Sequence, residues 1–181
     1  FMGVIISVVM GILLTMPTSS AAIWIAVASG ITTDSMLLAG GAAVVGCSCH
    51  MIGFAVASFR ENGVSGLISQ GLGTSMLQIP NVMKKPLIML PMVASSAILG
   101  PLSACVFKLK CGASGGGMGT SGLVGLFGVI DACAVYSVPT VNVVFGIVLC
   151  LFVIPAAVSL GVSELMRKKG WIQFGDQQLD S

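Results

Sequence analysis

Charge is what this sequence lacks most. Only 8% of its 181 residues are charged, whereas 56% are hydrophobic, and the mean hydropathy is +1.06. An average soluble domain carries about 25% charged residues. So large a deficit excludes an ordinary soluble domain and indicates a chain that lies in a membrane.

Histidine is scarcer still, with His50 as its single occurrence. A hydrolytic site needs a nucleophile, a base beside it and a group that orients the base, and no such set is present in context. Cys47, Cys49 and His50 could supply metal ligands, but positions i, i+2 and i+3 of one helix do not converge on a tetrahedral ion. The sequence therefore predicts no catalytic residue, no metal site and no cofactor.

The basic residues are few and lie in short groups at the ends of apolar runs. Seven of the eight are Lys84 with Lys85, Lys108 with Lys110, and 167–169, and the net charge is only +2. Such groups are typical of topology signals in membrane proteins, whereas nucleic-acid binding needs a basic face. We therefore expect no nucleic-acid partner. The densest group, 167–169, predicts a cytoplasmic C-terminus.

This orientation gives an expectation for the other basic groups. If residues 120–136 cross the membrane and 139–166 return, Lys108 and Lys110 lie on the cytoplasmic side as well. The pair at 84–85 then lies outside, unless one segment dips into the membrane and turns back. The conflict between the groups favours re-entrant hairpins.

Apolar runs between the charges predict the helices, because a spanning helix needs roughly 20 apolar residues. We expect spans at 36–59, 87–107 and 139–166. Residues 64–79 are amphipathic and too polar for a lipid-exposed span, so they predict a re-entrant or interfacial helix. Shorter features are expected as apolar pieces at 1–16, 21–31 and 120–136, an interruption at 17–20, an N-cap at Asp34 and a loop at 108–117.

The fold class predicted is an all-α polytopic membrane protein, with transmembrane helices and two re-entrant hairpin or broken-helix segments. Phe1 opens the chain inside an apolar run with no initiator Met. We therefore expect residues 1–169 to form a membrane transport domain that is the C-terminal part of a longer chain. Residues 170–181 are polar and are expected to form a cytoplasmic tail, with Trp171 as an interfacial anchor.

One motif occurs twice in this apolar chain. The pattern Gly-x-Gly-Thr-Ser-x-Leu spans 71–77 and again 117–123. Irregular backbone persists at membrane depth only where it is buried in protein or lines a wet cavity, and paired interrupted segments in transporters indicate the binding site. The repeat therefore predicts two polar tips that line the path of a solute. The alternative is that its glycines only allow helices to pack closely. The hydroxyls concerned are those of Thr74, Ser75, Thr120 and Ser121.

Four further polar residues join the predicted substrate-binding group. Gln78 and Asn81 directly follow the first copy of the motif and add donors and acceptors to the same tip. His50 lies near the middle of the span at 36–59, where a titratable group is a functional hypothesis by default. It either binds substrate or bridges two helices. Asp131 either binds substrate or a proton, or it marks a helix end.

The stretch 69–81 resembles the IIC-like membrane subunits of the bacterial phosphotransferase system, and the closest group is the one that contains the perfringolysin regulator PfoR. The segments 117–125 and 169–176 add to the resemblance. It implies a multi-pass carrier in the bacterial inner membrane, dimeric, with re-entrant hairpins around a sugar site. In that system phosphate reaches the sugar from a separate IIB partner, and no IIB-like or IIA-like domain occurs in this sequence.

The function predicted is thus an integral membrane carrier of the IIC type that moves a small polar solute, a sugar, by alternating access. The alternative is a membrane sensor or regulator that retains a transporter fold. The expected partners are the solute, the lipid bilayer, IIB and IIA proteins and a second copy of the chain.

Overall fold

The computed structural model describes residues 1–30 and 33–179 of the chain. Every regular element in these two ranges is a helix, and they contain no β-strand. The α-helices are α1 (Met2–Thr15), α2 (Ser20–Ala28), α3 (Asp34–Ala57), α4 (Phe59–Ile68), α5 (Ile79–Lys84), α6 (Leu90–Cys105), α7 (Val124–Val135), α8 (Thr140–Ile147) and α9 (Ile154–Lys168). The shorter π and 3-10 turns are η1 (Ser69–Gly73), η2 (Ser75–Gln78), η3 (Pro86–Met89), η4 (Ser121–Leu123) and η5 (Val148–Val153).

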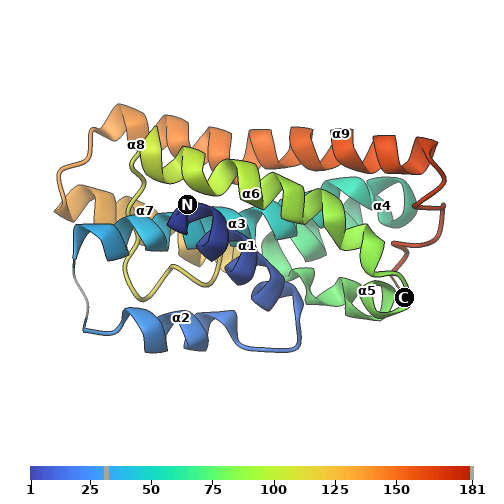
Figure 1. The fold of residues 1–181 in the computed structure, drawn as a ribbon, viewed down its shortest axis with the longest axis horizontal. Coiled ribbons are helices and arrows are strands. Elements are labelled where there is room, and N and C mark those ends of the chain that lie inside the picture. Colours follow the sequence, from blue (N-terminus) through green and yellow to red (C-terminus); the bar gives the residue numbers. More distant parts are fainter. Residues whose placement is uncertain (31–32, 180–181) are drawn as a thin grey trace.

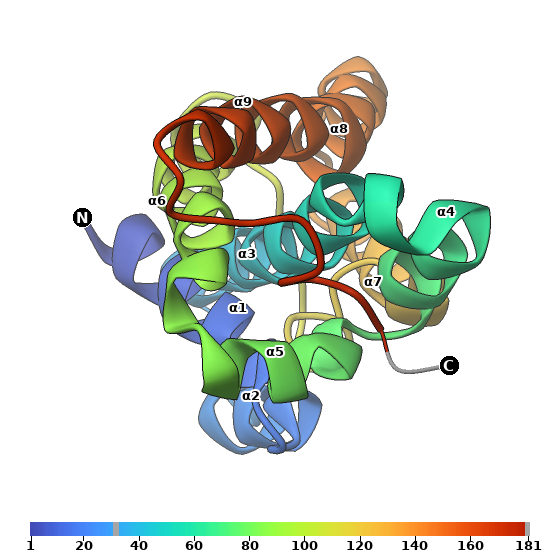
Figure 2. The same ribbon diagram turned by 90° about the vertical axis from the view of Figure 1, so that its right-hand side faces the viewer.

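Helix α3 lies at the centre of the bundle, surrounded by α1, α6, α7 and α9 (Figures 1 and 2). Its small residues allow this position, because neighbouring backbone approaches them closely. A Cβ atom on Gly46 would lie 2.0 Å from the carbonyl oxygen of Ser7, and one on Gly41 would lie 2.0 Å from that of Leu109. Nothing larger than glycine fits at these two contacts, so the sequence of α3 selects it as the central helix.

Three helical stretches are long and apolar enough to cross a membrane: Asp34–Ala57, Pro86–Cys105 and Thr140–Lys168. They correspond to the spans expected at 36–59, 87–107 and 139–166, and they confirm the prediction of an all-α membrane protein. The last stretch is continuous through η5, a π-turn that ends just before Pro155. Proline has no N–H to donate, so the regular hydrogen-bond ladder cannot run through it unchanged.

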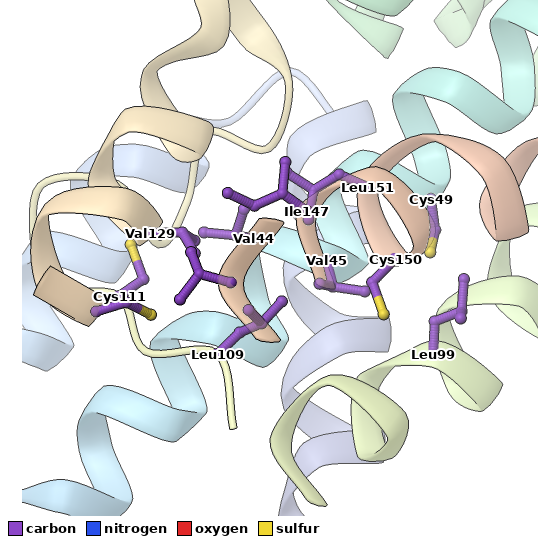
Figure 3. Close-up of a cluster of buried hydrophobic side chains, with 12 residues drawn as sticks. Val44, Val45, Cys49, Leu99, Leu109, Cys111, Val129, Ile147, Cys150 and Leu151 are labelled. Atoms are coloured by element: carbon purple, nitrogen blue, oxygen red, sulfur yellow. The ribbon is translucent and has the colours of Figure 1, made fainter. Parts of the chain in front are cut away.

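The largest buried apolar cluster lies where α3, α6, α7 and the α8–η5 stretch meet (Figure 3). Val44, Val45 and Cys49 of α3 contribute one side of it, and Leu109 inserts from the loop after α6. Leu109 is fully buried, so the loop predicted at 108–117 does not lie on the surface at this point. Burial of such side chains contributes roughly 1.5–3 kcal/mol each.

The charged side chains gather at the two ends of the bundle. At one end Arg60 pairs with Glu164, and Lys85 pairs with Asp176 of the C-terminal segment. At the opposite end Lys110 pairs with Asp34. Lys110 therefore lies at the end opposite the C-terminal tail, contrary to the expectation for Lys108 and Lys110. The pair at 84–85 lies at the end of the tail, as the alternative of a segment that turns back allowed. The chain turns back after η1 and returns 84–85 to the end that it had just left.

Two smaller expectations also need correction. The N-cap of α3 is Thr33, and Asp34 occupies the first helical position. The segment expected as one helix at 64–79 is broken: α4 passes into the π-turn η1, Thr74 is extended, and η2 follows. The apolar piece expected at 21–31 forms α2, and Ile31 lies outside the described residues.

Candidate functional site

The two copies of the Gly-x-Gly-Thr-Ser motif touch each other. The Thr120 hydroxyl donates to the carbonyl oxygen of Gly71 over 2.7 Å, and the Ser121 hydroxyl donates to that of Gly73 over 2.8 Å. Thr120 is fully buried and also lies 3.5 Å from the Met51 sulfur, within the last two turns of α3. The two motif segments are therefore in direct contact, and both side-chain hydroxyls of the second copy are used to join them.

The first copy uses its own hydroxyls differently. Thr74 breaks the helix, with φ −158° and ψ 143°, and its side-chain oxygen accepts a hydrogen bond from the amide of Met76. This is the geometry of an N-cap, and it starts η2. Ser75 is fully buried, and its hydroxyl lies 3.0 Å from that of Thr15 in α1. The sequence alone did not single out Thr15.

His50 takes part in the same buried group. Its Nδ1 lies 3.1 Å from the Thr15 hydroxyl, so a chain of hydrogen bonds runs from His50 through Thr15 to Ser75. The imidazole packs against α1, where a Cβ atom on Gly11 would lie 2.4 Å from the ring. Its buried Nε2 has no hydrogen-bond partner in the part of the chain that the structure describes. His50 therefore bridges two helices and keeps one ring nitrogen uncommitted.

Gln78 and Asn81 belong to a second polar group, which lies nearer the end of the bundle. The Gln78 amide donates to Gln70 over 2.9 Å, and Gln70 in turn donates to the Ser58 hydroxyl over 2.9 Å. Asn81 donates to the Gln78 side-chain oxygen over 2.9 Å. Buried amides need such partners, because an unpaired one costs about 1–3 kcal/mol. The broken segment is thus held from within by a row of amide side chains.

The C-terminal tail completes this second group. After α9 the chain turns across the end of the bundle and then runs between α4 and α5 (Figure 2). The main-chain oxygen of Gln177 accepts from Gln78 over 3.0 Å, and that of Gln178 accepts from Asn81 over 2.8 Å. The tail expected at 170–181 as a polar extension is packed into the fold as far as it is described.

Charged groups hold the tail at both sides. Glu61, whose side chain is only 1% exposed, accepts from Arg167 over 2.8 Å and from the amide of Gln177 over 2.8 Å. Lys85 donates to Asp176 over 2.6 Å. Burial acts to raise the pKa of Asp176, but hydrogen bonds from Lys85 and the Gln173 amide outweigh it and lower the pKa below its ordinary value. The pair is therefore intact at neutral pH and is lost only as the pH falls through the depressed pKa.

A pocket of about 730 Å³ lies beside these groups, between α4 and the segment that carries the first motif. Its polar lining residues outside the tail include two hydroxyls, two amides and a carboxylate, namely Ser65, Ser69, Asn62, Asn81 and Glu61. Of these, only Asn81 was predicted. The available signal was the recurrence of polar residues at 58, 62, 65 and 69, which is close to helical spacing.

Asp131 does not join either polar group. Helix α7 buries Val129, Ala132 and Cys133, and this orientation leaves Asp131 on the exposed side of the helix. The eight residues predicted for substrate binding thus divide in three. Thr74, Ser75, Thr120, Ser121 and His50 lie at or next to the contact between the motifs, Gln78 and Asn81 lie with the tail, and Asp131 lies apart.

Comparison with known proteins agrees with this picture of a membrane protein that carries polar groups inside an apolar bundle. A family model described as "Phosphotransferase system, EIIC" matches residues 1–179. Comparisons with curated proteins and with solved structures gave no match. The family match covers nearly the whole chain and confirms the resemblance found in the sequence at the level of the family. The chain belongs to the phosphotransferase system EIIC family and is a membrane component of its transporter type.

Proposed function

We propose that this chain forms the solute path of a carrier in the bacterial inner membrane, and that its solute is a sugar moved by alternating access. The observation that carries the proposal is the pocket of about 730 Å³ beside the first motif. Its volume is within the range of about 300–1,000 Å³ that is usual for small-molecule sites.

The chemistry of the lining supports a neutral polyol. Each sugar hydroxyl both donates and accepts a hydrogen bond, and the pocket offers the amides of Asn62 and Asn81, which do both, together with hydroxyls and the Glu61 carboxylate. Among the described lining residues Glu61 alone carries a full charge, and it already accepts a hydrogen bond from Arg167. Since the site presents no free cation among these residues, it suits an uncharged solute better than an anion.

The interrupted helix between α4 and α5 supports the proposal that part of the protein moves during transport. The chain between α4 and α5 passes from a π-turn through an extended residue to a 3-10 turn, and it is joined to the second motif by the hydrogen bonds of Thr120 and Ser121. In transporters, interrupted helices of this kind form solute sites and change during the transport cycle. We propose that Thr74, Ser75, Thr120, Ser121 and His50 line the continuation of the path toward the middle of the bundle.

The distribution of basic residues supports one orientation of the protein in the membrane. Six of the eight basic residues, at 60, 84–85 and 167–169, lie at or next to the end of the bundle that carries the tail. By the positive-inside rule this end faces the cytoplasm. We further propose a homodimer that works with separate IIB and IIA proteins, and membership of the PfoR-like group within the family.

The test is a sugar-dependent shift in thermal unfolding of the purified protein in detergent. We expect at least one sugar in a panel of hexoses, pentoses and hexitols to raise the unfolding temperature, since a ligand at 100 times its Kd stabilises by about 2.7 kcal/mol. Asn81→Ala should weaken the binding of that sugar about tenfold, because it removes one hydrogen bond at the site. Asn142→Ala, an exposed position on α8, is the matched control. If no sugar stabilises the wild-type protein, the proposal is wrong.

A further inference from the structure

We propose that the C-terminal tail segment Asp176–Leu179 is a latch that competes with the solute. Its main chain takes the hydrogen-bonding groups that a bound sugar would take, so the carrier binds its solute tightly only when the tail leaves. This inference rests on the proposed function, because it names how the same pocket is regulated.

The first support is the way in which Asn62 holds the tail. The Asn62 side-chain nitrogen donates to the main-chain oxygen of Gln177 over 2.8 Å, and its side-chain oxygen accepts from the amide of Leu179 over 2.8 Å. One amide side chain thus pairs with two backbone groups, as a neighbouring β-strand would. Asn62 recognises the backbone of the tail in these contacts and makes none to its side chains.

Three other side chains in or next to the pocket wall also bind the main chain of the tail. Gln78 donates to the main-chain oxygen of Gln177, Asn81 donates to that of Gln178, and Glu61 accepts from the amide of Gln177. Main-chain amides and carbonyls present donors and acceptors of the kind that sugar hydroxyls present. The tail therefore occupies Asn62, Asn81 and Glu61, which are also the groups that make the pocket polar.

The second support is position. Gln178 and Leu179 themselves form part of the wall of the pocket of about 730 Å³. The tail to which they belong crosses the end of the bundle (Figure 2). A sugar that hydrogen-bonds to Asn62 and Asn81 would have to displace these two residues. Occupancy by the tail and full occupancy by a solute are thus mutually exclusive at these atoms.

The third support is that the contacts that hold the docked tail are incomplete. The Gln177 side chain is fully buried, yet its Nε2 has no hydrogen-bond partner among the described residues. A buried donor without an acceptor opposes docking. Gln178 is exposed and Leu179 is half-buried, so little apolar surface holds the segment in place. The tail is bound by polar contacts that a solute with its own hydroxyls can replace.

A substitution at Gly175, in the turn before the latch, should release the tail without creating a steric clash. Gly175 has φ +98°, and a Cβ atom there would meet nothing within 4 Å. Gly175→Ala would therefore strain the backbone of the docked tail without any clash, because residues with a Cβ rarely adopt positive φ. Gly161 in α9 also has open space for a Cβ but no positive φ, so Gly161→Ala is the matched control.

The experiment compares wild type, Gly175→Ala and Gly161→Ala in the full protein, by hydrogen exchange of the tail and by sugar binding. The amides of Gln177 and Leu179 both donate to side chains, so they should be protected in wild type. Gly175→Ala should speed their exchange about tenfold and lower the Kd for the sugar about tenfold, while Gly161→Ala changes neither. By reciprocity, a saturating sugar should speed tail exchange in the wild type.

A charge reversal at Asp176 should release the tail by an independent route, and a second reversal at Lys85 should restore the docked tail. Asp176→Lys would repel Lys85 and free the tail, and the double variant Lys85→Asp with Asp176→Lys should restore both slow exchange and weak sugar binding. Tail exchange that is already fast in wild type, or release of the tail without tighter sugar binding, would overturn the latch. If sugars bind all variants with equal Kd, only the latch fails. If no sugar binds any variant, the carrier function fails and the latch fails with it.

Discussion

The two copies of the Gly-x-Gly-Thr-Ser motif have the same sequence pattern and different structures. The first, 71–77, runs from a π-turn through an extended Thr74 into a 3-10 turn. The second, 117–123, follows a run of turns and contains three residues with positive φ: Gly119, Gly122 and Leu123. A sequence repeat is therefore not a structural repeat here, and the surroundings decide what each residue does.

The glycines illustrate the difference most directly. A Cβ atom on Gly119 would lie 2.7 Å from the Cβ of Cys47, and the residue has φ +57°. At the equivalent position of the first copy, a Cβ on Gly73 would meet nothing within 4 Å, and φ is not positive. At this position only the second copy needs glycine, because the backbone of α3 at Cys47 and Ser48 lies directly against Gly119 and nothing lies within 4 Å of a Cβ on Gly73.

The hydroxyls differ in the same way. In the second copy Thr120 and Ser121 reach across to carbonyl oxygens of the first, whereas in the first copy Thr74 caps its own turn and Ser75 contacts α1. The second copy thus holds the contact together. The first is held from several sides and lies next to the pocket.

The largest expected effect comes from adding a methyl group to the two equivalent glycines. Gly119→Ala should destabilise the protein by about 3 kcal/mol or more, because the Cβ clashes and the backbone angle is strained. Gly73→Ala should change the stability by less than about 0.5 kcal/mol, as at a free surface position. Thermal unfolding of the two variants in detergent measures the difference. Equal destabilisation would show that the two copies are under the same constraint after all.

A smaller effect is expected from removing the threonine hydroxyls at constant shape. Thr120→Val should cost about 2 kcal/mol, since it leaves the Gly71 carbonyl without this donor in a buried site. Thr74→Val should cost about 1 kcal/mol, the usual value for an N-cap. Unfolding in detergent with urea gives both numbers. A larger loss at Thr74 than at Thr120 would contradict the assignment of the joining role to the second copy.

The smallest effect is expected from the serines. Ser75→Ala removes a fully buried partner of Thr15 and should cost about 1 kcal/mol. Ser121→Ala removes a hydrogen bond at a half-buried position where water can replace it, and should cost less than about 0.5 kcal/mol. The same unfolding assay ranks the pair, and the reverse order would mean that Ser121 is shielded from water.

Much of the helical architecture could be predicted, because hydropathy over roughly 20 residues is a property of the local sequence. The spans expected at 36–59, 87–107 and 139–166 agree with the observed stretches to within two residues at nearly every end. The motif also located a true break in the chain. The side on which each basic pair lies could not be predicted, because it depends on where the chain turns back after η1.

The polar contacts could not be predicted either, because they join residues that are far apart in the sequence. Glu61 and Asn62 directly follow the span expected at 36–59, and their partners in the tail, at 177 and 179, lie more than 100 positions away in the chain. The sequence left Asp131 open between binding a substrate or proton and marking a helix end, and the rotation of α7 turns it outward. Rotation about a helix axis decides which side chains face the interior, and only packing sets it.

The membrane environment, the positions of the long apolar helices and the two polar segments that lie between them could be inferred from the sequence alone. These follow from hydrophobicity and from proline and glycine, which act over short stretches of chain. The tertiary structure decided that the two motifs meet, that His50 bridges α1 and α3, and that the tail lies against the pocket. Hydrogen bonds act over about 3 Å, so partners distant in sequence are chosen only when the helices have packed.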